Sequence, residues 1–250
     1  MLEAFTKETG IEVRYDVLDG NEILEAKLLA GNTGYDVVFP TAWPYVKRQA
    51  ASGLYMPLQR KWLPNYKQID PDFLKRMEKA DPKNEFAIPY TWGLVAIGYN
   101  PDLIPKTINP DVLQSWALIY DLKIISNLAP KGITLLDDPL DVYTTFYIYQ
   151  GMNPNDMSRA LLKDMTDRLK NLRPHYRRFG SNLVAEQLGG GELAVVMHWS
   201  GILSTARQKF KSINPDVNIE IVLPKEGTTM WIDCIAIPKD APHPESAHKF

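Results

Sequence analysis

Segments rich in β-branched and aromatic residues alternate along this chain with segments of helical periodicity, and this alternation constrains the fold more than any other feature. The first part of the chain predicts a strand over 11–17, a helix over 21–31, a strand over 35–40 and a helix from Tyr45 to Ala51. Strands that alternate with helices are joined by crossover connections and lie mainly parallel in one sheet. The sequence therefore predicts an α/β fold with a mainly parallel sheet.

A group of prolines, Pro101, Pro105 and Pro110, interrupts the alternation and marks a crossover between two lobes. A length of 250 residues allows two domains, each with its own core. Around and beyond the break we expect helices over 71–81, 112–120, 138–151, 157–172, 181–191 and 200–210, and strands over 86–90, 94–100, 133–137, 176–179, 192–199, 217–224 and 229–238.

Composition excludes several classes of protein. The net charge of −2 argues against a basic nucleic-acid binder, and the 45% hydrophobic content argues against disorder. The single Cys234 excludes a disulfide within the chain and a zinc site built on paired cysteines. No apolar run reaches the ~18 residues of a membrane span, and the N-terminus has no signal-peptide pattern. Both ends read as interrupted helices, so we expect a fragment of a longer protein.

Motifs for catalysis or for cofactors are weak. The four histidines form no HExxH pattern, and Ser200 lacks the first glycine of a GxSxG elbow. Gly189, Gly191 and Ala194 match GxGxxA, but a helix precedes them and a strand follows, which is the reverse of a dinucleotide-binding turn. The sequence predicts no enzyme, no cofactor and no metal, and its 8 Phe, 6 Trp and 12 Tyr favour recognition.

Acidic and aromatic residues lie at the ends of predicted strands, where an α/β fold opens its ligand crevice. Three such segments are PTAWPY (40–45), LDDPLD (136–141) and MHWSG (197–201). In a fourth, WID, Trp231 and Asp233 share one face of a strand at period two. These segments are the candidate binding site.

The order and spacing of these motifs resemble the periplasmic polyamine-binding proteins, the putrescine and spermidine receptors of bacterial ABC importers. The resemblance begins in GYDVVFPTAW, continues through FAIPYTWGLVAIGYN and LLDDPLDVY, and ends in LPKEGTTMWIDCIAIP, so it covers essentially the whole chain. It implies two α/β lobes of the type II periplasmic-binding-protein fold, joined by two β-strand crossovers that close on a ligand. The crossovers are expected near 97–100 and 223–227, with lobe one over 1–98 plus 227–250 and lobe two over 99–226.

The resemblance also implies site residues. Asp233 with Trp231 matches the ligand aspartate that follows an aromatic residue, Asp141 matches the carboxylate of the second lobe, and Trp199 matches the aromatic of the WxG segment. Thr41 and Trp43 of the PTAWPY loop complete the predicted set, and Trp43 stands where the family usually has a small polar residue or Tyr. Carboxylates would offset the desolvation of a diammonium ligand, and flat aromatic walls would contact its methylenes and charged ends.

The implied partners are a polyamine and the permease subunits of an ABC importer in the inner membrane, and the implied location is the periplasm. Ile202 departs from the family, because a second ligand carboxylate is expected at this position. A receptor of the same fold for another small solute is therefore one open alternative. Two readings from other classes also stay open: a polyamine sensor, and an α/β enzyme with a noncanonical site in which Asp233 takes part. Trp199 could also serve core packing, and Asp141 could simply favour its helix N-terminus.

Overall fold

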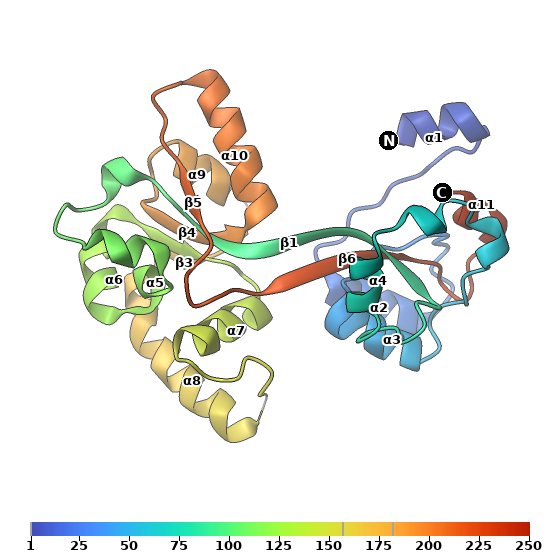
Figure 1. The fold of residues 1–250 in the computed structure, drawn as a ribbon, viewed down its shortest axis with the longest axis horizontal. Helices are drawn as coiled ribbons and strands as arrows, with labels where there is room; N and C mark the ends of the chain where they lie inside the picture. The colour runs from blue at the N-terminus through green and yellow to red at the C-terminus, as the bar shows by residue number, and fades with distance from the viewer. Residues whose placement is uncertain (1, 157, 182) are drawn as a thin grey trace. The chain divides into compact units, whose positions relative to one another are not determined.

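The structure is a computed structural model that describes residues 2–156, 158–181 and 183–250 (Figure 1). The chain divides into two compact units, unit 1 with Met1–Trp92 and Trp231–Phe250, and unit 2 with Gly93–Met230. The chain changes unit inside strand β1 (Ala87–Tyr99) and near the start of strand β6 (Met230–Ala236). The lobe boundaries predicted after residues 98 and 226 fall within unit 2, six and four residues from these changes of unit.

Unit 1 contains short helices and the parts of β1 and β6 that belong to it (Figure 1). Its helical elements are α1 (Leu2–Thr9), α2 (Asn21–Ala30), η1 (Ala42–Val46), α3 (Lys47–Ala51), η2 (Arg60–Trp62), η3 (Tyr66–Gln68), α4 (Pro71–Met77) and α11 (Pro244–Lys249). The N-terminus of α4 shows why the sequence folds this way locally. Asp70 accepts a hydrogen bond from the backbone N of Asp72 at 2.8 Å, and Pro71 occupies the first helical turn, where its missing N–H costs nothing.

Two strands predicted in this unit are absent. Residues 11–17 adopt no strand, and Tyr15 and Val17 are 66% and 78% exposed. The 35–40 segment makes one isolated antiparallel bridge, Val38 with Ala236. The 11–17 prediction was wrong because β-branched residues favour extended backbone, but a strand forms only where a second strand supplies its hydrogen bonds. The 35–40 segment does exchange backbone hydrogen bonds with β6, but this pairing does not extend beyond an isolated bridge. Two further isolated bridges, Thr41 with Asp233 and Tyr55 with Pro238, are also antiparallel.

Unit 2 is built on a sheet with the strand order β3-β2-β4-β1-β5, and β6 also pairs with β1. The strands are β2 (Ile133–Leu135), β3 (Arg178–Phe179), β4 (Val195–Trp199), β5 (Glu220–Val222) and β1. β2 runs parallel to β3 and β4, whereas β1 runs antiparallel to both of its neighbours, β4 and β5. Four of the five strands therefore point the same way. The predicted parallel pairing is confirmed for β3, β2 and β4, but the sheet is mixed, because β1 enters from unit 1 instead of following a crossover helix and pairs antiparallel with β4 and β5.

Helices cover both faces of this sheet (Figure 1). They are α5 (Ala117–Tyr120), α6 (Leu122–Leu128), α7 (Pro139–Tyr149), α8 (Arg159–Leu172), α9 (Val184–Gly189) and α10 (Ser200–Ile213), with the 3-10 turns η4 (Pro101–Leu103), η5 (Pro110–Gln114), η6 (Ala129–Lys131) and η7 (Arg173–His175). Val95, Ile97 and Tyr99 of β1 point into a core shared with α5–α8, and Ala96 points into a second core with α9 and α10. This alternation at period two produces a three-layer α/β unit. Within the described residues, no helix has the length and apolar character that a membrane crossing requires.

Candidate functional site

In unit 2, Asp141 lies in the first turn of α7, shortly after strand β2 ends. Asp138 caps this helix by accepting a hydrogen bond from the backbone N of Asp141 at 3.0 Å, and Pro139 occupies the first turn. A carboxylate in this position is stabilised by the positive end of the helix dipole. The local sequence therefore fixes where the Asp141 carboxylate lies.

Two side chains from distant segments donate to the Asp141 carboxylate. The indole Nε1 of Trp199, at the end of β4, donates to Oδ2 at 3.0 Å. The hydroxyl of Thr229 donates to Oδ1 at 3.3 Å. The structure thus brings together Asp141 and Trp199, two residues that sequence reasoning selected separately. It also adds Thr229, whose only signal was its place in the TTMWID segment.

The environment of Asp141 raises the pKa of its carboxyl group. Burial raises the pKa of Asp141 to about 6, the nearby Asp138 carboxylate adds to this rise, and the hydrogen bonds from Trp199 and Thr229 oppose it. Among the described residues, no lysine, arginine or histidine forms an ion pair with this carboxylate. A cation brought beside it would favour the ionised form.

In unit 1, Thr41 connects two chain segments to Asp233. Its hydroxyl donates to Asp233 Oδ1 at 2.7 Å and accepts from Asn21 Nδ2 at 3.0 Å, while its backbone N donates to Asn21 Oδ1 at 2.9 Å. Asn21 begins α2, so this helix holds the Thr41 hydroxyl in its donating orientation. Sequence reasoning selected Thr41 and Asp233 but missed Asn21.

Asp233 retains binding capacity after this contact. Burial raises the pKa of Asp233, and the hydroxyl of Thr41 partly offsets the rise. Across the described part of the chain, Thr41 is the one side chain that hydrogen-bonds the Asp233 carboxylate, and no cationic side chain pairs with it. This carboxylate therefore also lacks a counter-ion from the protein.

The burial pattern of β6 places Trp231 beside Asp233 along the strand. Ile232, Cys234 and Ala236 are buried, whereas Trp231 and Asp233 are half-buried, so these two residues lie on the more open face of the strand. This is the period-two arrangement that the sequence predicted. Cys234 packs in the core, where burial raises the pKa of its thiol above the ordinary range.

Trp43, the remaining predicted residue, differs from the others. Its side chain is 51% exposed, and the ammonium of Lys47 lies 4.2 Å from the centroid of its ring. Trp43 has extended backbone, φ −117° and ψ 130°, within an otherwise helical segment, and the Trp43–Pro44 peptide bond is cis. The aromatic surface of this residue thus already holds a cation from its own chain.

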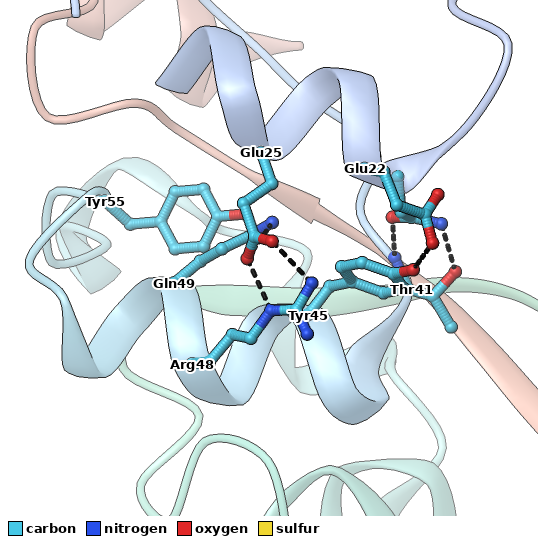
Figure 2. Close-up of polar contacts among 8 residues, drawn as sticks. Glu22, Glu25, Thr41, Tyr45, Arg48, Gln49 and Tyr55 are labelled. Carbon is cyan, nitrogen blue, oxygen red and sulfur yellow. Dashed lines mark hydrogen bonds and ion pairs between the residues drawn. The ribbon is translucent and has the colours of Figure 1, made fainter. Parts of the chain in front are cut away.

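A polar network anchors the loop that carries Thr41 and Trp43 (Figure 2). The guanidinium of Arg48 makes two hydrogen bonds to the Glu25 carboxylate, one from Nε at 2.6 Å, and Tyr45 donates its hydroxyl to Glu22. The side chain of Gln49 reaches the same Glu25 carboxylate at 3.4 Å. Bidentate arginine–carboxylate pairs have a defined geometry, so this network holds α3 against α2.

The described residues contain no cluster of three or more His, Cys, Asp or Glu side chains that could bind a metal ion.

Comparison with known proteins agrees with these features. Residues 1–250 match the family described as bacterial extracellular solute-binding protein. The chain is 38% identical over 248 residues to the putrescine-binding periplasmic protein PotF of Escherichia coli K12, covering 98% of this chain and 67% of the relative. It is 38% identical over 250 residues to the putrescine-binding periplasmic protein SpuD of Pseudomonas aeruginosa UCBPP-PA14, covering 100% of this chain and 68% of the relative.

Solved structures support the same fold. The spermidine/putrescine ABC transporter substrate-binding protein PotD of Streptococcus pneumoniae superposes with a TM-score of 0.76 at 27% identity, covering 100% of this chain and 71% of that chain. The lipoprotein Tp0655 of Treponema pallidum has a TM-score of 0.85 at 22% identity, covering 99% and 73%. The chain is a member of the bacterial extracellular solute-binding protein family with a type II periplasmic-binding-protein fold, and its relatives include putrescine- and spermidine-binding proteins.

Proposed function

We propose that this chain is an extracytoplasmic receptor that captures a polyamine such as putrescine or spermidine and delivers it to an ABC importer. Asp141 and Asp233 act as two anionic anchors, each for one ammonium group of the ligand. Trp199 and Trp231 provide aromatic surface beside these carboxylates, and Thr41 provides a hydroxyl donor.

One observation carries this proposal: both predicted ligand carboxylates are half-buried, and no described cationic side chain pairs with either. Buried carboxylates are normally paired because an uncompensated charge away from water is costly. A dication supplies the missing partner at both positions. The printed names of the relatives, which bind putrescine or spermidine, support the same class of ligand.

Membership of a family of receptors supports binding without turnover. A receptor leaves its ligand chemically unchanged, so the expected result of long incubation with a polyamine is full recovery of the amine. The periplasmic relatives support the same location for this protein and permease subunits of an ABC importer as its partners. Uptake of labelled polyamine by cells that express the receptor with its importer, compared with cells lacking the receptor, tests the delivery step.

Calorimetric titration of the chain with putrescine, cadaverine, spermidine and spermine tests the binding step, with an amino acid as the ligand control. We expect saturable binding of at least one polyamine and its loss in Asp233→Ala. Binding that survives unchanged in Asp233→Ala would contradict the assigned anchor. Absence of binding to all four amines would contradict the proposed ligand class.

A receptor of the same fold for another small solute is the second candidate, and two observations favour it. Ile202, 43% exposed in the first turn of α10, stands where the family resemblance predicts a further carboxylate. The Lys47 ammonium lies over Trp43 and would repel a second cation at that ring. The Ile202→Asp variant separates the two candidates: increased diamine affinity supports a polyamine pocket at this position, and unchanged affinity argues against one.

A further inference from the structure

Directly before Trp199 in β4 lies His198, a buried imidazole with 1% exposure whose two ring nitrogens both have partners. Nε2 lies 3.0 Å from the carbonyl oxygen of Ser181, and Nδ1 lies 2.8 Å from the backbone N of Trp199. A backbone N–H can only donate, so Nδ1 accepts, while Nε2 carries the proton and donates to Ser181. These two contacts select one neutral tautomer of the ring.

The contact with Trp199 occurs where the chain turns from strand to helix. Trp199 ends β4 with extended backbone, φ −67° and ψ 134°, and α10 begins at the next residue. Its backbone N–H is one of the donors that a helix N-terminus leaves without an intrahelical partner, and His198 supplies the acceptor. The two rings also pack edge to face, with centroids 5.3 Å apart and an interplanar angle of 88°. His198 therefore constrains both the backbone and the side chain of Trp199.

The orientation of Trp199 matters because its Nε1 is a donor to Asp141, at 3.0 Å. A hydrogen bond weakens steeply as its donor–hydrogen–acceptor angle departs from linear, so a rotation of the indole would weaken or remove this contact. We propose that His198 is a positioning residue: by accepting the Trp199 N–H and packing against its ring, it aims the indole at the Asp141 carboxylate. Its effect on a ligand rests on the proposed function, whereas its effect on the ligand-free chain does not.

Two conservative substitutions separate the contributions of the two hydrogen bonds that the His198 ring makes. His198→Asn keeps an acceptor near the position of Nδ1 but cannot reach Ser181, whereas His198→Gln keeps a donor near Nε2 and removes the acceptor for the Trp199 amide. The readout is the indole Nε1 proton resonance of Trp199 in the ligand-free protein, assigned with Trp199→Phe. His243→Asn, at an exposed histidine of unit 1, is the matched control.

We expect His198→Asn to leave the indole resonance in place and His198→Gln to move it upfield, as the bond to Asp141 is lost, while both variants keep the wild-type far-ultraviolet circular dichroism. We also expect His198→Gln to weaken polyamine binding about tenfold, the effect of losing one hydrogen bond to a charged group, and His198→Asn to bind within about twofold of wild type. An unmoved indole resonance in His198→Gln, or a shift confined to His198→Asn, overturns the proposal. If the resonance shifts as expected but wild type binds no polyamine, the positioning role stands and the proposed function fails.

Discussion

The ionisation of Asp141 leads to a quantitative prediction for ligand binding. With a pKa raised by burial to about 6, this carboxylate is mostly ionised at pH 7 and mostly protonated at pH 5. The ionised fraction falls from about 0.9 to about 0.1, because each pH unit changes the ratio of the two forms tenfold. An ammonium group pairs with the ionised form only, and primary amines remain charged across this range. Lowering the pH from 7 to 5 is therefore expected to weaken polyamine affinity about tenfold through Asp141 alone.

Because the pKa of Asp233 is also raised, the assay must separate the two groups. Calorimetric titrations of wild type and Asp141→Asn at pH 5, 6 and 7 provide the comparison, since the variant keeps the Asp233 contribution. Between pH 7 and pH 5, the polyamine affinity of wild type should fall about tenfold more than that of the variant. On binding the ligand at pH 6, wild type should release close to half a proton more than the variant. An equally steep pH dependence in both proteins, or equal proton release, would refute the reasoning for Asp141.

Three further predictions concern stability and ligand access. Asp141→Asn should stabilise the ligand-free chain at pH 7 by up to about 3 kcal/mol, because the raised pKa makes the ionised carboxylate costly in the folded state. Near pH 3.5 the effect should be small, because this carboxyl group is mostly protonated in both the folded and the unfolded state; urea denaturation at the two pH values checks this, and equal effects would contradict it. Lys47→Met should raise polyamine affinity about threefold, because it removes the cation that lies over the Trp43 ring, and Lys47→Arg is the control that keeps the charge. Equal affinities of Lys47→Met and wild type in a titration would place Trp43 away from the ligand. Gly98→Ala should destabilise unit 2 by about 1–3 kcal/mol in urea denaturation, since a Cβ there would lie 2.7 Å from the buried Leu203 side chain; a neutral effect would mean that α10 moves aside without cost.

The sequence was informative where local patterns and tertiary structure agree. In unit 2, the predicted strands other than β1 follow a helix and pair with a neighbouring strand, so β2 and β4 form near their predicted positions. In unit 1, the 11–17 segment has the composition of a strand but no neighbour to pair with. Periodicity reports a preference for extended backbone, and only the tertiary structure supplies the partner strand.

The same distinction holds for the candidate site. The chemistry of Asp141, Trp199, Thr41 and Asp233 was visible in their residue types and their places at strand ends. Their pairing was not visible, because the Asp141–Trp199 and Thr41–Asp233 contacts span 58 and 192 residues of sequence. The tautomer of His198 depends likewise on the carbonyl of Ser181, 17 residues away, and no sequence motif encodes such a contact.

The most direct test of the two-anchor account compares putrescine with butylamine, which lacks one ammonium, in wild type, Asp141→Asn and Asp233→Asn. The account predicts that wild type prefers putrescine by at least about tenfold, the effect of one charge-assisted hydrogen bond, and that either variant loses most of this preference because one ammonium no longer has its carboxylate. A preference for putrescine that persists undiminished in both variants would contradict the central claim that these two carboxylates bind the ends of a polyamine.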